Sequence, residues 1–141
     1  MYRKILVALE HTARDQNVIQ EITQLAGLLH SELLLVHVAD GWVARNFDAL
    51  EMAESEEMRQ DREYLASVAA RMREAGLTVN SVLALGNPPE QILKTASTEG
   101  CDLIAMTTHG HRLFLDILLG STIEHVRHES KVPLLLVRAG E

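Results

Sequence analysis

The sequence MTTHGHRLFLDILLGS, residues 106–121, joins a short apolar run to a segment with helical periodicity. Gly110 stands just after the apolar run, and the pair Gly120-Ser121 follows after nine intervening residues, where the helical pattern begins. Glycine lets the backbone approach a ligand closely, and the free amides at a helix N-terminus attract anions. The stretch therefore predicts a strand, a ligand-binding loop and a helix that together cradle a phosphate group, as in a nucleotide-binding protein.

Outward from this stretch, apolar runs alternate with amphipathic segments. The runs predict five strands, over residues 4–9, 32–39, 78–85, 102–106 and 133–137. The amphipathic segments predict four helices, over residues 14–30, 51–75, 88–98 and 120–128, the third after an N-cap at Asn87. Runs that are apolar on both faces are typical of a parallel sheet covered by helices. We therefore expect an α/β domain with a five-stranded parallel sheet sandwiched by helices and joined by right-handed crossovers.

Two of the predicted helices have a clear apolar face. Their apolar side chains recur at intervals of three and four, which is typical of a helix packed on a sheet. The residues expected to face the sheet are Val18, Ile22, Leu25, Ala26 and Leu29 in the first helix and Met58, Leu65, Val68, Ala69 and Met72 in the second. Residues 41–50 show no period and are interpreted as a loop.

Composition and charge narrow the class of protein. The chain has 141 residues, 47% of them hydrophobic, which suits one domain with a substantial core. The net charge of −7 argues against non-specific nucleic-acid binding, which needs Lys and Arg. Neither a membrane-spanning segment nor a signal peptide is evident. Cys101 is the single cysteine and cannot form an intramolecular disulfide, so we expect a cytoplasmic protein.

The predicted topology also indicates where a ligand binds. In doubly wound sheets ligands lie beyond the C-terminal ends of the strands, at the point where the strand order reverses. The loops that follow the first, second and fourth predicted strands, residues 10–12, 40–41 and 107–119, are therefore the candidate ligand loops.

Sequence segments along the entire chain carry a family resemblance. They read ILVALEHT, LLLVHVAD, LGNPPEQIL, CDLIAMTTHG, LLGSTIEHV and VPLLLVR. These segments are similar to those of the universal stress protein family. Its nucleotide motif is Gly, two residues, Gly, nine residues, then Gly-Ser or Gly-Thr, and here Thr107, Gly110 and Gly120-Ser121 occupy the anchor positions. The resemblance implies one domain over residues 1–141, with a Rossmann-like fold of the adenine-nucleotide α-hydrolase type and strand order 3-2-1-4-5.

The resemblance also implies an adenine-nucleotide site, with ATP as the ligand and Mg²⁺ held through its phosphates. Gly110, Gly120 and Ser121 would present groups to the phosphates, Val38 would pack against adenine, and Arg112 would neutralise phosphate charge. His109 and His111 are further candidates for that charge, and for each of these three residues, Arg112 included, a solvent-facing loop position is the alternative. The full set expected at the site is Ala8, Leu9, Glu10, Val38, Met106, Thr107, His109, Gly110, His111, Arg112, Gly120, Ser121 and Thr122.

Two positions depart from the family pattern. Thr107 replaces the first glycine; a positive φ there would be costly for a β-branched residue, whereas a negative φ would simply add a hydroxyl. Glu10 replaces an Asp that approaches the adenosine, and it keeps the carboxylate acceptor. The family includes members that bind ATP and members that do not. The alternatives are therefore an ATP-binding regulatory module, a nucleotide-free interaction protein on the same fold, or a weak ATPase.

Other chemistry is not indicated. The chain has no G-x-S-x-G, no Walker A lysine and no G-x-G-x-x-G after its first strand. The parts needed for fast phosphoryl transfer do not assemble, so no catalytic residue is assigned. His109 and His111 lack a convincing further partner for zinc, and no metal site made of protein groups alone is expected. His37 is interpreted as an interior or edge histidine, and Cys101 as a buried or inert thiol.

The last predicted strand indicates an oligomer. Pro133 is tolerated at the edge of a sheet, and an exposed apolar edge usually needs a partner. The resemblance implies a homodimer in which two copies of this strand pair antiparallel. The residues expected at that interface are Val132, Pro133, Leu134, Leu135, Leu136 and Val137. A protein partner of unknown identity is expected as well, whereas nucleic acid and membrane are not.

Overall fold

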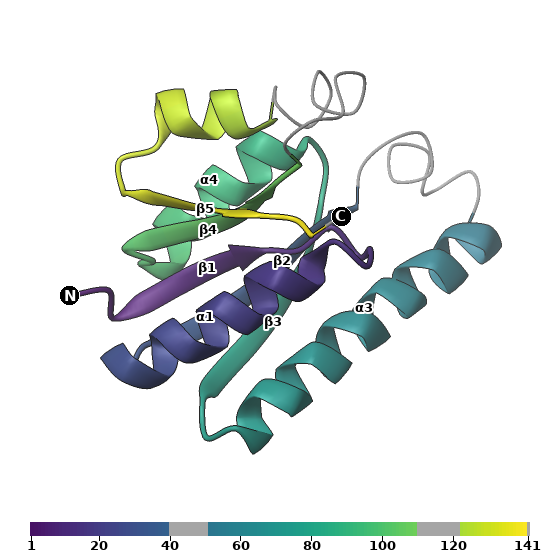
Figure 1. Ribbon diagram of the computed structural model, residues 1–141. Helices are drawn as coiled ribbons and strands as arrows, with labels where there is room; N and C mark the ends of the chain where they lie inside the picture. The colour runs from purple at the N-terminus through teal and green to yellow at the C-terminus, as the bar shows by residue number, and fades with distance from the viewer. Residues whose placement is uncertain (40–50, 110–121, 141) are drawn as a thin grey trace.

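The computed structural model describes residues 1–39, 51–109 and 122–140, and it contains a five-stranded parallel sheet. The strand order is β3-β2-β1-β4-β5, so both the fold class and the order are confirmed (Figure 1). The strands are β1 (Lys4–Ala8), β2 (Glu32–Ala39), β3 (Thr78–Leu85), β4 (Leu103–Thr108) and β5 (Leu134–Arg138). Val7 of the central strand lies beside Leu35 on one neighbour and Ala105 on the other.

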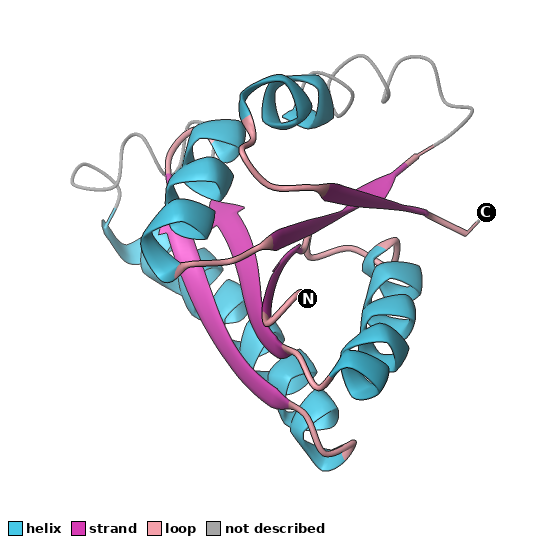
Figure 2. Ribbon diagram, turned by 90° about the vertical axis from the view of Figure 1, so that its left-hand side faces the viewer, coloured by secondary structure: helices cyan, strands magenta, loops and turns pink. Residues whose placement is uncertain are grey.

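Helices cover both faces of this sheet (Figures 1 and 2). On one face α1 (Asp15–Leu29) and α3 (Glu51–Glu74) bury one apolar cluster, with Val18, Ile22, Leu65 and Val68 against the odd-numbered side chains of β1 and β2. On the other face α4 (Pro88–Glu99) and the helix over residues 122–129 bury a second cluster. Two clusters on opposite faces are what strands buried on both sides require.

The element boundaries differ from the predictions by one or two residues. β1 ends at Ala8, and β4 continues to Thr108 because it pairs with β5 as far as Arg138. Asn87 caps α4 as predicted, since its side chain accepts a hydrogen bond from the amide of Glu90. The loop assigned to residues 41–50 and the start of the last helix at Gly120 lie outside the described residues.

One prediction about the apolar face of α1 is wrong. Leu29 is 39% exposed, because α1 ends there and His30 turns away in the left-handed conformation, with φ of 58°. At the opposite end of the helix a charged residue takes up interior space: Asp15 is only 1% exposed. The buried face of α1 therefore begins at its first residue and ends before Leu29. This places the Asp15 carboxylate beneath the β1–α1 loop.

β5 forms one edge of the sheet. Among the described residues β5 pairs with β4 alone, which confirms the edge position expected from Pro133. Leu136 is 42% exposed there. Across the described part of the chain, no helix is both long and apolar enough to cross a lipid bilayer.

Candidate functional site

A cavity of about 220 Å³ opens at the C-terminal ends of the central strands. Its position corresponds to the reversal of strand order between β1 and β4, where ligands of doubly wound sheets bind. The residues that line it come from five parts of the fold: Ala8 at the end of β1 with Glu10 just after it, Val36, His37 and Val38 on β2, Pro88 and Ile92 on α4, Met106 and Thr107 on β4, and Thr122 and Ile123 on the last helix.

The walls of this cavity are mostly apolar, with polar groups at its edge. Val38, Ile92 and Met106 present aliphatic surface from β2, α4 and β4. Glu10 and Thr122 add polar groups around that surface. A small apolar slot with a few convergent polar groups is typical of a small-molecule site, and a flat heterocycle suits it.

Thr107 lies in this site without backbone strain. It is part of β4, and among the described residues only Tyr2, His11 and His30 are non-glycine residues with positive φ. The prediction of a costly positive φ is therefore excluded, and the alternative of an added hydroxyl applies. Because side chains alternate along a strand and Met106 packs on the face of α4, the Thr107 side chain points to the opposite face. The side chain therefore does not fill the slot.

Glu10 and His109 form a pair at the edge of the cavity. The Glu10 Oε1 atom lies 2.7 Å from His109 Nε2, across 99 residues of sequence. The His109 side chain is 1% exposed, so the interpretation of a solvent-facing loop residue is wrong. Its Nδ1 atom and the Thr107 hydroxyl have no hydrogen-bond partner within the described part of the chain. The imidazole holds the Glu10 carboxylate in place.

A buried carboxylate holds the loop that carries Glu10. Asp15, the first residue of α1, accepts hydrogen bonds from the amides of Glu10 and His11, at 2.8 and 2.9 Å. It also accepts one from the Tyr64 hydroxyl of α3, at 2.5 Å. Burial, followed by this bond, raises the pKa of Tyr64, so the hydroxyl remains a donor throughout the neutral range. The first turn of a helix also favours a negative charge.

A second carboxylate on α3 faces two histidines of the same region. Asp61 Oδ1 lies 2.6 Å from His11 Nδ1 and 3.6 Å from His37 Nε2. His37 Nδ1 donates to the carbonyl oxygen of Leu9, at 2.8 Å, which fixes the orientation of its ring. The His11 ring stacks on that of Tyr64, with 4.2 Å between centroids. His37 is therefore an interior histidine with satisfied hydrogen bonding, as expected, and its side chain joins the β1–α1 loop to α3.

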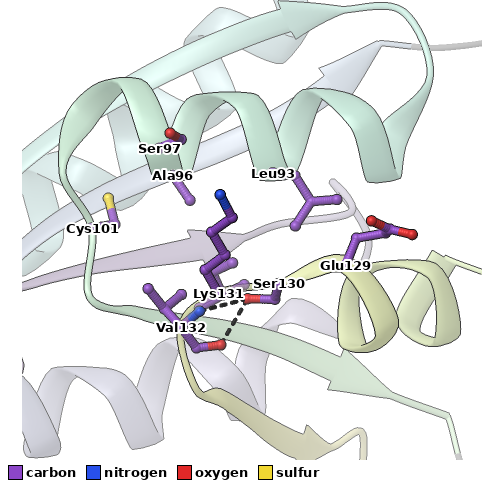
Figure 3. Close-up of a pocket in the computed structure, with 9 residues that line it drawn as sticks. Leu93, Ala96, Ser97, Cys101, Glu129, Ser130, Lys131 and Val132 are labelled. Atoms are coloured by element: carbon purple, nitrogen blue, oxygen red, sulfur yellow. Dashed lines mark hydrogen bonds between the residues drawn. The ribbon is translucent and has the colours of Figure 1, made fainter.

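A different cavity, of about 270 Å³, lies on the same face but at the other end of the strands (Figure 3). It is bounded by Leu93, Ala96 and Cys101 around α4 and by Ser130 and Val132 before β5. Figure 3 shows Ser130 hydrogen-bonded to Val132, which ties this segment to itself. Burial raises the pKa of Cys101 to about 11, so the thiol stays protonated and unreactive at neutral pH, as expected of an inert cysteine.

The structure brings together only part of the expected site. Six of the expected residues line the cavity between β1 and β4: Ala8, Glu10, Val38, Met106, Thr107 and Thr122. Leu9 is buried on the other face, and only its backbone oxygen, bonded to His37, contributes here. Gly110, His111, Arg112, Gly120 and Ser121 lie outside the described residues. Sequence reasoning missed Asp15, Asp61 and Tyr64 because no local motif marks them.

Metal ligands do not gather in the described ranges 1–39, 51–109 and 122–140. No group of three or more His, Cys, Asp or Glu side chains is arranged there to hold an ion. The short distance between Asp61 and His11 is that of a hydrogen bond.

Known proteins share this fold. The model of the universal stress protein family matches residues 1–138. The chain belongs to the universal stress protein family. Among its relatives, universal stress protein MJ0577 of Methanocaldococcus jannaschii is 26% identical over 155 residues, covering 98% of this chain and 96% of the relative. The solved structure of MJ0577 superposes with a TM-score of 0.86 and covers 100% of this chain and 99% of that one.

Two further solved members of the universal stress protein family carry nucleotides. One, from Archaeoglobus fulgidus, is a complex with dAMP; its TM-score is 0.71 at 19% identity, covering 96% of this chain and 98% of that one. Another is a complex with cAMP, with a TM-score of 0.72 at 18% identity, covering 99% and 98%. At these identities the likeness establishes a shared fold with this universal stress protein.

Proposed function

We propose that this universal stress protein binds an adenine nucleotide, with ATP as the physiological ligand, and acts as a nucleotide-dependent regulatory switch. The observation that carries the proposal is the cavity between the ends of β1 and β4, with aliphatic walls and the Glu10 carboxylate at its edge. Adenine would lie between Val38 and Ile92, and Glu10 would accept from the ribose or the base. The dAMP and cAMP complexes of two relatives on the same fold support this ligand class.

The triphosphate would extend toward the start of the last helix. Thr122 lines the cavity there, and its backbone amide belongs to the N-terminal end of that helix, which favours an anion. The glycine motif predicted at Gly110 and Gly120-Ser121 would complete the cradle. Mg²⁺ is commonly held mainly by phosphates and waters. That mode suits this chain, whose described residues supply no three-ligand cluster.

A regulatory role fits the described residues better than rapid catalysis. A lone carboxylate paired with a histidine, Glu10 with His109, does not supply the metal ligands, base and charge stabilisers of phosphoryl transfer. In this proposal the protein is a cytoplasmic binding module whose ATP occupancy changes its conformation or its choice of protein partner.

The nucleotide content of freshly purified protein tests this proposal. The protein would be denatured, the supernatant separated by ion exchange, and the nucleotide-free protein titrated by calorimetry with ATP-Mg, AMP, dAMP and cAMP in turn. We expect about one adenine nucleotide per chain, with ATP bound most tightly. No bound nucleotide and no heat at millimolar ATP would contradict the proposal and favour the nucleotide-free interaction protein. Steady release of ADP above that of a cavity-filled variant would favour the weak ATPase.

We also propose a homodimer formed by antiparallel pairing of β5 with β5 of a second copy. β5 is an edge strand with exposed Leu136, and such an edge favours pairing with another strand. Replacing Leu136 with lysine should disfavour the pairing and yield monomers, because an edge lysine resists strand addition. Sedimentation equilibrium of the wild type and of Leu136→Lys measures this. A wild-type monomer, or a dimer that Leu136→Lys leaves intact, would contradict the proposed interface.

A further inference from the structure

Helix α3 contacts the β1–α1 loop, which carries Glu10, through two side chains that belong neither to the family motif nor to the cavity lining. Tyr64 donates to Asp15, which in turn accepts from the amides of Glu10 and His11. Asp61 bonds His11 directly and lies 3.6 Å from His37. The two α3 residues are three positions apart, so they project from the same face of the helix. Helix α3 is therefore attached to the loop at two points.

His37 belongs to both the cavity and this attachment. Its strand position borders the cavity, while its side chain, on the opposite face with α3, donates from Nδ1 to the carbonyl of Leu9 and directs Nε2 toward Asp61. Glu10 likewise lines the cavity, and its backbone amide is held by Asp15. A ligand that contacts Glu10 and His37 would therefore contact residues one bond away from α3.

Buried charges surround the contacts between α3 and the β1–α1 loop, so these contacts depend closely on the positions of the groups involved. Asp15 and Asp61 are both buried, the Asp61 side chain being 9% exposed. Groups from the neighbouring elements face them: Glu10 and His11 from the loop, His37 from β2 and Tyr64 from α3, while His109, just after β4, bonds Glu10. The ion pairs that the structure describes for Glu10 and Asp61 are with histidines alone. Buried carboxylates held in this way tolerate little displacement, because an unpaired one is costly.

We propose that Asp61 and Tyr64 are positioning residues of the nucleotide site, and that through them nucleotide occupancy and the placement of α3 are coupled. This inference rests on the proposed function and deepens it by naming the element that responds. Asp61 positions His11 and His37, and Tyr64 positions Asp15. Together they fix where the Leu9–Glu10–His11 backbone lies at the edge of the cavity. Coupling between two sites is reciprocal, so whatever stabilises this attachment raises nucleotide affinity and bound nucleotide stabilises α3.

The response should be detectable in α3 itself. Amides of residues 58–68 lie in the part of the helix that carries both contacts, and nucleotide binding is expected to slow their hydrogen exchange. A ligand that only stabilised the fold as a whole would slow exchange along all of α3, without a larger effect at residues 58–68. Exchange measured with and without AMP and ATP-Mg therefore separates positioning from simple structural support.

Three single substitutions test the proposal: Asp61→Asn, Tyr64→Phe and, as the matched control on the same helix, Glu63→Gln. Glu63 is exposed and pairs with Arg59 on the surface. We expect Asp61→Asn and Tyr64→Phe each to weaken AMP and ATP-Mg binding by roughly tenfold, the effect of one lost hydrogen bond to a charged group. Both should abolish the nucleotide-dependent protection of α3, whereas Glu63→Gln should change neither property.

The outcomes distinguish this proposal from the proposed function. Wild-type protein that binds nucleotide without protecting α3, or variants at both positions that bind with wild-type affinity, would overturn the coupling and leave nucleotide binding intact. Wild-type protein that binds no nucleotide would overturn both. Tyr64→Phe keeps the ring stacked on His11 and removes only the hydroxyl, so it remains informative where Asp61→Asn fails to fold.

Discussion

Replacing Asp15 with alanine is expected to lower the free energy of unfolding by about 3 kcal/mol. The carboxylate is 1% exposed and accepts from the Glu10 amide, the His11 amide and the Tyr64 hydroxyl. Alanine leaves these three donors without their acceptor and removes a negative charge from the first turn of α1, where it is favourable. Urea denaturation at neutral pH measures the loss as a lower midpoint with an unchanged slope.

Asp102 offers a matched control for that substitution. Its carboxylate also accepts from two backbone amides, those of Arg3 and Lys4, at 3.0 and 3.2 Å. It lies at the exposed end of β1, where water replaces a lost acceptor. Asp102→Ala should therefore cost about 1 kcal/mol. Equal losses for the two variants would contradict the claim that Asp15 anchors the β1–α1 loop.

The fold could be predicted because its signal is local and repeated. Each strand is a short apolar run. In the helices apolar residues recur at helical spacing, as Met58, Leu65 and Met72 do in α3. The order of the strands came from the family resemblance, and the sheet has that order. Leu29 was predicted wrongly because periodicity continues past the point where α1 reaches the edge of the core.

The candidate site could be predicted only where chain position determines it. Ala8, Val38 and Met106 come at the ends of strands, and a parallel sheet brings such ends together. The pairs that hold the loop are different in kind: His11 and Asp61 are 50 residues apart, and Asp15 and Tyr64 are 49 apart. Their contact depends on the rotation of α3 about its axis and on its depth over the sheet. Hydrophobic periodicity identifies the apolar face of a helix. It does not identify which loop the polar side chains beside that face contact.

The replacement of glycine by Thr107 shows the same limit. From the sequence, the added side chain could have blocked the site or been harmless, depending on φ. The structure places Thr107 within β4, where the side chain turns to the face opposite the slot. The departure from the family motif therefore does not argue against a nucleotide at this site.

Filling the cavity should abolish nucleotide binding with little loss of stability. Val38 lies on its wall at the end of β2 and is only partly buried, so Val38→Trp can direct an indole ring into the space of about 220 Å³. We expect affinity for AMP and ATP-Mg to fall more than about 100-fold, equivalent to about 2.7 kcal/mol. The cavity opens to solvent, so the ring should enter with less strain than in a closed core.

Leu28→Trp is the matched control for this prediction, because Leu28 lies on α1, 79% exposed and away from the cavity. It adds the same ring and should bind nucleotide as the wild type does. Calorimetric titration measures affinity, and the thermal midpoint of each variant reports whether the fold is intact.

Because Val38 contacts neither Asp61 nor Tyr64 in the hydrogen-bond network, Val38→Trp should also leave the hydrogen exchange of α3 in the nucleotide-free protein unchanged. Val38→Trp protein that still binds nucleotide tightly would place the ligand elsewhere on the sheet. Loss of binding with α3 undisturbed would show that the cavity holds the ligand.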